Sequence, residues 1–268
     1  STGRRLERWS AWVPQFFVSR YRGTTRTLQR YLGAWRKWVE FLAEHRVTAP
    51  AQLDYNGVLA FVAWREGSVR HCGKNVGRNT ALCDVKVMSL VMREAMRRGF
   101  ALGNPCERLG LRRDPPKEKA PLTAEEIAKI RAAVATREAH LPIGQRWMTV
   151  SFEIALHQGC RLSETAVPLT AIDEARREII FLGKGRNGQK RELVTQLHPA
   201  LLPLVAELRA AGCTHTCVLP RMAAKEWWAL RQELGLGHTT FHATRVTVIT
   251  ELSRRGISEQ QAMRYVGH

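Results

Sequence analysis

Helical spacing of apolar residues dominates the first half of the chain. Residues 24–45 carry a wide apolar stripe at three- and four-residue steps, made of Leu28, Tyr31, Leu32, Trp35, Trp38, Val39 and Leu42. Further helices are predicted at about 53–66, where Ala49-Pro50 suits a start, and at about 74–98, where Gly99 suits a stop. An additional helix at the front is indicated by Trp9, Trp12, Phe16 and Phe17. Residues 1–111 are therefore predicted to form a compact helical domain.

The pattern changes at residues 112–121, which are charged and proline-rich and hold no apolar residue larger than alanine. Such a composition predicts an extended linker between two domains. The second domain is then residues 122–268. It opens on a helix, because Thr123 and Glu126 have the spacing of a capping box ahead of an apolar run.

The second domain mixes two periods. Residues 178–182 and 191–194 are strand-like, and Asn187-Gly188 between them is a strong hairpin turn signal. Helices are predicted at about 144–157, 199–211 and 222–234, with Trp227 and Trp228 in the core. The predicted fold is mainly α with a small β-hairpin or sheet, in two domains.

The charge of the chain points to a polyanionic partner. The net charge is +18, and residues 1–121 hold 23 Lys and Arg against 10 Asp and Glu, whereas the remainder holds 19 against 14. A generally basic, soluble surface is the plainer reading, but so large an imbalance favours nucleic acid. No apolar run reaches the length of a membrane span, and no signal-peptide pattern appears at the start.

The cysteines indicate a reducing compartment and no cofactor site. None of the six forms a C-x-x-C pair, which favours a cytosolic setting. Cys213, His215 and Cys217 are spaced tightly for a tetrahedral zinc ion, and no fourth ligand is evident. Cysteines that flank a turn are the better interpretation, and we expect neither a metal nor another cofactor.

Three stretches carry candidate chemistry: GCRLSE at 159–164, GKGRNGQKR at 183–191, and FHATR at 241–245 with Gly267-His268. Arg161 and Glu164 can pair three residues apart, and His242 and Arg245 can likewise share one helix face. Arginine matches phosphate oxygens with a planar fork, and histidine donates or exchanges a proton near neutral pH. Taken singly, each stretch also fits a structural ion pair, a solvated turn or a solvated helix face.

In this order and at this spacing, the three stretches resemble the tyrosine recombinase, or phage-type integrase, family. The resemblance spans 122–268 and extends more faintly to the helices before it. It implies a helical core-binding domain and a mixed α/β catalytic domain that clamp double-stranded DNA. Two positions depart from the family pattern, since Cys160 replaces a small or apolar residue and Val246 stands where a histidine is frequent.

The resemblance also implies roles for individual residues. Glu164 would orient the first arginine, and Lys190 is the runner-up for the catalytic lysine. The catalytic set would be Arg161, Lys184, His242, Arg245 and His268. Candidate DNA contacts are Arg30, Lys74, Arg78 and Lys86 in the first domain and Arg186 in the hairpin.

The nucleophile of the family is a tyrosine roughly ten residues, or about three helical turns, after the Gly-His pair. The sequence stops at His268, so we expect this tyrosine beyond it, deleted or unrecorded. Tyr265 precedes the Gly-His pair at a position that is apolar in the family, and we expect it to pack. Tyr21, Tyr31 and Tyr55 belong to the first domain.

The resemblance implies a site-specific recombinase that cleaves and rejoins DNA through a 3′-phosphotyrosyl intermediate. It would act as a dimer to tetramer on DNA, in the bacterial cytoplasm, on behalf of a mobile element. Two alternatives stay open on the same fold: a non-catalytic DNA-binding or regulatory protein, and a type IB topoisomerase. An RNA-binding helical protein would rest on charge alone.

Overall fold

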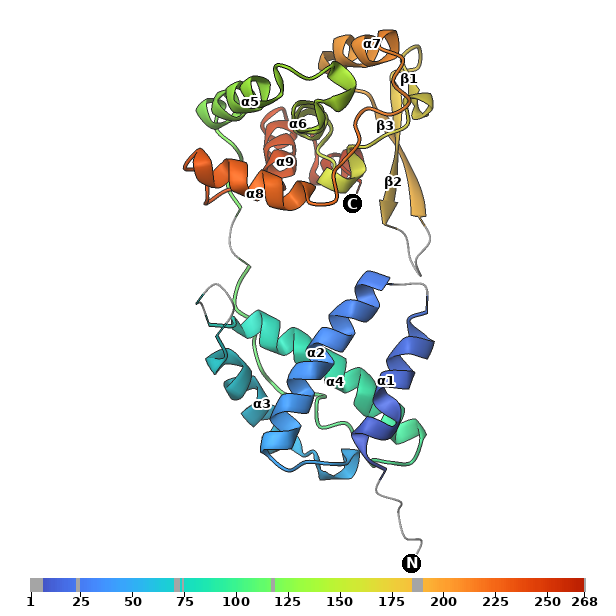
Figure 1. Cartoon of the computed structure of the whole chain (residues 1–268), viewed down its shortest axis with the longest axis vertical. Helices are drawn as coiled ribbons and strands as arrows, with labels where there is room; N and C mark the ends of the chain where they lie inside the picture. Colours follow the sequence, from blue (N-terminus) through green and yellow to red (C-terminus); the bar gives the residue numbers. More distant parts are fainter. Residues whose placement is uncertain are drawn as a thin grey trace, which may run out of the picture. The chain divides into compact units, whose positions relative to one another are not determined.

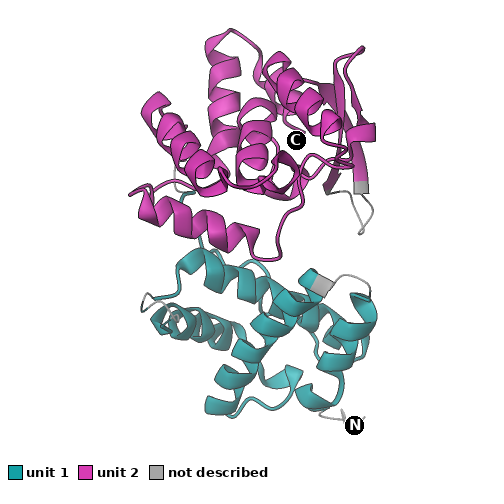
Figure 2. Ribbon diagram, turned by 45° about the horizontal axis from the view of Figure 1, so that its top comes forward, with its two compact units in different colours: residues 1–116 teal, residues 117–268 magenta. Residues whose placement is uncertain are grey.

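The computed structural model describes residues 7–22, 25–69, 73, 75–116, 119–184 and 190–267. Figure 1 labels its helices and strands in chain order. The chain divides into two compact units, residues 1–116 and 117–268 (Figure 2). The point of division falls inside the segment 112–121 that the composition assigns to a linker.

Unit 1 is a bundle of helices around an aromatic core. Its helices are α1 (Trp9–Arg20), α2 (Thr25–Glu44), α3 (Tyr55–Gly67) and α4 (Arg78–Arg97), with a short 3-10 turn η1 (Pro50–Gln52). The apolar stripe of α2 packs on the other three helices. At its centre the buried Trp38 ring stacks on Phe61, with ring centroids 3.5 Å apart. The predicted helices are present, and Val39 lies at the exposed edge of the stripe.

Helix α4 begins at Arg78, four residues later than the predicted start at Lys74. Backbone hydrogen bonds explain why the helix starts later in the sequence. Asn75 pairs with Val69 in an isolated antiparallel bridge, and the Val76 amide donates to the Ser68 carbonyl. Gly77 is still extended as the residue before the helix. These pairings hold residues 75–77 out of the helical conformation.

Unit 2 combines helices with a small sheet. The early elements are α5 (Ala124–Glu138), η2 (Ile143–Gln145), α6 (Trp147–Gln158), η3 (Leu162–Glu164), η4 (Leu169–Ala171), β1 (Ile172–Asp173), β2 (Glu178–Lys184) and β3 (Lys190–Gln196). They are followed by η6 (Pro199–Leu201), α7 (Leu202–Ala210), α8 (Ala223–Glu233), α9 (Ala243–Arg254) and α10 (Glu259–Tyr265). Helices α6 and α9 pack together in the middle of the unit, with the sheet on one side and α5 and α8 on the other (Figure 1).

The sheet is antiparallel in the order β1-β2-β3, and its register decides which side chains face the helices. Ile179 and Phe181 of β2 are buried on the inner face, whereas Leu182 points to the opposite, exposed face. Gly183 pairs with Arg191, so both belong to the inner set. A mainly helical fold with a small sheet is confirmed. The sequence pattern missed β1, which is only two residues long.

Two expectations for unit 2 have contrasting outcomes. The predicted capping box of Thr123 with Glu126 is present at the start of α5, and Ser258 with Gln261 forms a second one at the start of α10. The prediction of two core tryptophans is half wrong, because Trp227 is 2% exposed and Trp228 is 55% exposed. Neighbouring helical residues point about 100° apart, so both rings cannot enter the same core.

The ends of the linker are tied to their own units. In unit 1, the Arg78 Nε donates to the Arg112 carbonyl at 2.9 Å, and the Asn79 amide donates to the Asp114 carbonyl at 3.0 Å. In unit 2, the Leu122 amide donates to Thr247 Oγ1 on α9 at 2.8 Å. Residues 115–121 lie between these two anchored ends. Among the described residues, no helix is long and apolar enough to cross a membrane.

Thr247 is predicted to anchor the first residue of unit 2 to α9. Its hydroxyl accepts from Leu122 and donates to the Ala243 carbonyl. Thr247→Val keeps the shape of the side chain but leaves the Leu122 amide unpaired, which should lower the free energy of unfolding by about 1–2 kcal/mol. Urea denaturation measures this loss. Thr250→Val on the same helix is the matched control, and an equal loss in the control would contradict the anchoring role.

Candidate functional site

Arg245 is a fully buried cation that lacks a full set of partners. It lies in the first turn of α9, which packs against α6 and holds the side chain at 0% exposure. Its Nη1 donates to the Gly159 carbonyl at 2.9 Å. Its Nε and Nη2 are buried and have no hydrogen-bond partner among the described residues. A buried guanidinium with two unpaired donors is suited to bind an anion.

Burial and a second arginine act together on this charge. Burial lowers the pKa of Arg245, the nearby charge of Arg161 lowers it further, and Glu164 opposes both. An arginine side chain nevertheless stays protonated in proteins. Two like charges that face one another are stabilised when an anion comes between them. The electrostatics of the site therefore favour the bound state of a phosphate.

Arg161 and Glu164 form the ion pair that the sequence predicted. The Arg161 Nη1 donates to Glu164 Oε1 at 2.7 Å, and the Arg161 amide donates to Glu164 Oε2 at 2.7 Å. The Arg161 side chain is 43% exposed and that of Glu164 only 10%, so the carboxylate holds the guanidinium from below. Part of the fork stays available to solvent or a ligand.

The GCRLSE stretch ends in a single 3-10 turn, Leu162–Glu164, which does not continue as a longer helix. Two features end it early. Val167 and Thr216 exchange hydrogen bonds, which keep Val167 in an extended segment. Pro168 follows directly, and a residue before proline avoids the helical conformation.

A pocket of about 200 Å³ lies in front of these arginines. It is built by the end of α6, by strands β2 and β3, and by the residues that follow α10. The described lining residues are Gln158, Cys160, Arg161, Glu164, Phe181, Gly183, Arg191, Leu193, Tyr265, Val266 and Gly267. Arg245 lies behind the wall formed by residues 158–161, through its bond to Gly159. The three motif stretches thus converge in space.

The residues that follow α10 reach this pocket because they pack closely at glycines. Gly159 ends α6 with a φ of +63°, and a Cβ placed there would lie 2.6 Å from Val266 Cγ1 and 3.3 Å from Val248 Cβ. A Cβ on Gly267 would collide with Leu193 Cδ2. Only glycine permits these approaches.

The structure describes the other predicted catalytic residues to different extents. His242 is half-buried directly before α9, and its carbonyl accepts from the Arg245 amide at 3.1 Å. Lys184 ends β2, next to the pocket residue Gly183, and its backbone pairs with Lys190. The side chain of Lys184 is not described. Arg186 and His268 lie outside the described residues.

The predicted DNA contacts of unit 1 are on two helices. Arg30 on α2 and Lys86 on α4 are exposed. The guanidinium of Arg78 is engaged, since it donates to the Arg112 carbonyl and forms an ion pair with Glu66 at 3.3 Å. Lys74 lies outside the described residues.

Tyr265 packs, as expected. Its hydroxyl donates to the His157 carbonyl at 3.1 Å and lies 3.2 Å from Gln158 Oε1, and its carbonyl accepts from Thr195 Oγ1. Burial raises the pKa of the Tyr265 hydroxyl to about 12, and the neighbouring Cys160 adds to the effect. The phenol is thus held neutral and its proton is engaged, which disfavours a role as nucleophile.

Gln158 and Arg191 are site residues that sequence reasoning missed. Gln158 is buried, donates to the Gln196 carbonyl and accepts from the His198 amide, so it joins α6 to the end of β3. A single glutamine near a helix end gives no signal in a sequence. Arg191 was visible as one of four basic residues near the turn, but only the strand register shows that it faces the pocket.

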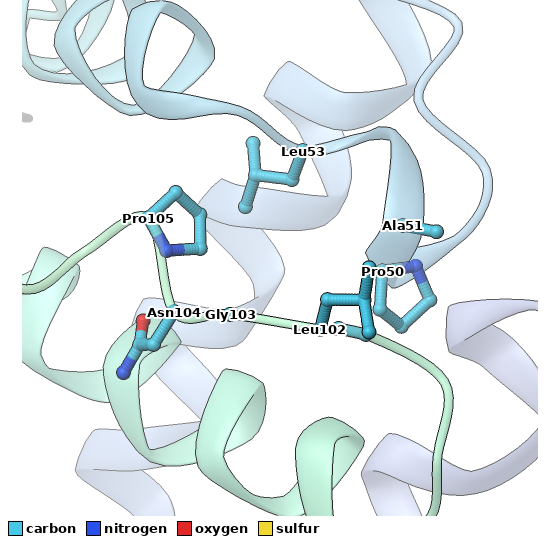
Figure 3. A pocket seen from close by; sticks show the side chains of 8 residues that line it. Pro50, Ala51, Leu53, Leu102, Gly103, Asn104 and Pro105 are labelled. Atoms are coloured by element: carbon cyan, nitrogen blue, oxygen red, sulfur yellow. The ribbon is translucent and has the colours of Figure 1, made fainter.

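A hollow in unit 1 carries no comparable chemistry. A cavity of about 400 Å³ in unit 1 is lined by apolar residues and by Asn104, which points away from Leu53 and Leu102 (Figure 3). The Asn104 amide is already bonded to Ser89 and Glu107. Across the ranges that the structure covers, no three His, Cys, Asp or Glu side chains are grouped as metal ligands.

Solved structures show what this fold resembles. A lambda integrase dimer bound to a COC′ core site aligns with a TM-score of 0.71 at 20% identity, covering 98% of this chain and 92% of the integrase chain. A Tn1549 transposon integrase in complex with circular intermediate DNA aligns at 0.64 and 14% identity, covering 96% and 91%. XerH site-specific recombinase bound to difH aligns at 0.56 and 13%, covering 90% and 72%.

The chain therefore has the fold of these integrases and recombinases over nearly its whole length. No protein-family model matches the chain, and no curated protein sequence matches it either. At such low identity the likeness shows the fold, and the residues of the site must carry the argument for function.

Gly159→Ala should test the close approach behind the pocket. An alanine here would strain the backbone at its positive φ, and its Cβ would collide with Val266. Together these effects should lower the free energy of unfolding by about 2–4 kcal/mol. Gly235→Ala is the matched control, because Gly235 has a similar φ of +71° but nothing within 4 Å of an added Cβ. It should lose only about 1 kcal/mol. Equal losses in urea denaturation would show that Val266 does not press on Gly159.

Tyr265 should make stability depend on alkaline pH. Its pKa is raised in the folded state, so between pH 10, its ordinary value, and about 12 the folded protein retains a proton that the unfolded chain releases. Stability is then present below pH 10 and falls as the pH rises toward 12. Tyr265→Phe should flatten that part of the curve. Unchanged pH dependence, measured by urea denaturation of both proteins, would contradict the buried neutral phenol.

Proposed function

We propose that this chain is the DNA-binding and phosphate-activating part of a site-specific recombinase of the tyrosine class. The observation that carries the proposal is the buried Arg245, two of whose donors lack a partner among the described residues, beside Arg161 held by Glu164. These groups lie on a fold shared with integrases solved on DNA. A net charge of +18 supports double-stranded DNA as the partner.

The reaction is a transesterification at a phosphodiester. A tyrosine oxygen attacks phosphorus, the bond from phosphorus to the 5′ oxygen breaks, and the DNA strand is left joined to the protein as a 3′-phosphotyrosine. Extra negative charge develops on the two non-bridging oxygens in the transition state. Arg161 and Arg245 are proposed to hold that charge, which a preorganised pair of cations does without moving.

The remaining roles are proposed from the sequence stretches in which these residues lie. His242, at the start of α9, and His268 are proposed to position the oxygens by hydrogen bonds. Lys184, at the end of β2, is proposed to give a proton to the departing 5′ oxygen as general acid. When the 5′ hydroxyl of another strand attacks the phosphotyrosine, these steps run in reverse, and the bond energy is conserved.

We propose that none of the tyrosines in residues 1–268 is the nucleophile. The Tyr265 hydroxyl is bonded to His157 and Gln158 and has a raised pKa, which leaves it unsuited to attack. Tyr21 and Tyr31 stack edge to face, and the Tyr55 hydroxyl donates to the Leu109 carbonyl. These three belong to unit 1, whereas the paired arginines belong to unit 2.

Assembly on DNA is part of the proposal. Lambda integrase was solved as a dimer bound to a core site and as a tetramer bound to a Holliday junction. We therefore propose that two to four copies of this protein act together on their DNA.

Arg245→Lys is predicted to separate chemistry from binding. Lysine keeps the charge but loses the planar fork, so we expect cleavage to fall by about 10²–10³ while DNA affinity changes little. Duplexes that bind the complete gene product are first selected from random DNA. A labelled selected duplex then reports cleavage as a covalent protein–DNA complex on a denaturing gel.

The control variant is Arg254→Lys, an exposed arginine at the other end of α9. It should cleave like the unchanged protein. Normal yield of the covalent complex from Arg245→Lys would overturn the role of Arg245. Relaxation of plasmids that lack a selected site would favour a topoisomerase. Tight binding without any covalent complex in the unchanged protein would favour a DNA-binding protein on a recombinase fold.

A further inference from the structure

Strand β3 runs along the segment that completes the pocket, and its inner side chains contact that segment in steps of two residues. Thr195 Oγ1 donates to the Tyr265 carbonyl at 3.1 Å. Two residues earlier, Leu193 packs on Gly267 so closely that a Cβ there would collide with it. Arg191 is the next inner residue, since it pairs with Gly183. Each step of two residues advances about 7 Å along a strand, so Arg191 lies beyond the point where β3 meets Gly267.

Arg191 brings an uncompensated positive charge to the pocket. It lines the pocket together with Arg161 and Glu164, and it is exposed. Glu164 is the one acid among the described lining residues, and both of its oxygens already accept from Arg161. Arg191 forms no ion pair with any residue that the structure describes. An exposed guanidinium in a pocket that is also lined by Arg161 is suited to bind an anion.

The position of Arg191 differs from that of the two arginines already assigned. Arg161 and Arg245 are linked through residues 159–161, with Arg245 behind the pocket wall and Arg161 on it. Arg191 comes from strand β3, so it reaches the pocket from a different element. A single phosphate held by Arg161 and Arg245 would leave Arg191 free to take a neighbouring one.

We propose that Arg191 binds a second backbone phosphate of the cleaved DNA strand, next to the one held by Arg161 and Arg245. This inference rests on the proposed function, and it adds a residue that fixes the register of the strand in the site. A guanidinium that holds the adjacent phosphate prevents the strand from sliding, so the reacting phosphate stays at the buried arginine.

The salt dependence of DNA binding tests this assignment, because each phosphate contact contributes about 0.9 to the slope of log K against log salt. The probe is a labelled selected duplex, and binding is measured by fluorescence anisotropy between low and moderate salt. Arg191→Gln should lower the slope by about 0.9, whereas Arg191→Lys should keep it near that of the unchanged protein. Arg176→Gln is the matched control, since Arg176 is exposed in the turn between β1 and β2 and does not line the pocket.

A double variant distinguishes one phosphate from two. If Arg161 and Arg191 hold separate phosphates, Arg161→Gln with Arg191→Gln should lower the slope by about 1.8, the sum of the single losses. A combined loss of about 0.9 would mean a shared phosphate and would overturn the proposal. Circular dichroism and a thermal melt verify that the variants stay folded, as expected for an exposed side chain.

The outcomes separate the inference from the proposed function. If Arg161→Gln lowers the slope and Arg191→Gln does not, the inference fails and the proposed function stands. If Arg176→Gln and Arg191→Gln lower it equally, Arg191 is one surface cation among others and the inference also fails. If the unchanged protein shows no salt-dependent binding to duplex DNA, the proposed function itself fails.

Discussion

The hydrogen bond from Arg245 to the Gly159 carbonyl is the interaction on which the rest of the site depends. It fixes the start of α9 against the end of α6, at a point where a left-handed glycine turns the chain toward Arg161. Because Gly159 has no side chain, Val248 and Val266 can approach it from α9 and from the residues after α10. One contact therefore sets the relative positions of both arginine motifs and of the Gly-His segment.

This arrangement is costly for the protein without a ligand. A buried guanidinium loses its hydration, and two of its donor groups have no partner among the described residues. A protein that needed only a stable core would place an apolar side chain there. The cost makes physical sense if an anion completes the hydrogen bonding, because the binding energy is then largest for a ligand that presents oxygens to Nε and Nη2. The unpaired donors thus link the packing of α9 to phosphate chemistry.

Much of this molecule could be predicted from its sequence, and the failures have physical reasons. Apolar periodicity predicted the helices of unit 1, and Asn187-Gly188 with its flanking alternation predicted the hairpin strands. The late start of α4 depends on a bridge between Val69 and Asn75 that no local pattern encodes. Motif spacing selected Arg161, Glu164 and Arg245, yet the buried state of Arg245 comes from tertiary packing. Gln158 and Arg191 depend on a long-range hydrogen bond and a strand register, which only the fold supplies.

The excess of basic residues and the buried arginine lie in different parts of the chain. Residues 1–121 carry most of the excess of basic residues, while the buried arginine lies in the other unit. Affinity that comes from many surface cations does not depend on sequence or on exact geometry, whereas charge stabilisation in a reaction needs fixed groups. Hydrogen bonds fix the chain at Arg112 and Asp114 in unit 1 and at Leu122 in unit 2. Since Leu122 is bonded to α9 itself, the short segment between the units ends on the helix that carries Arg245.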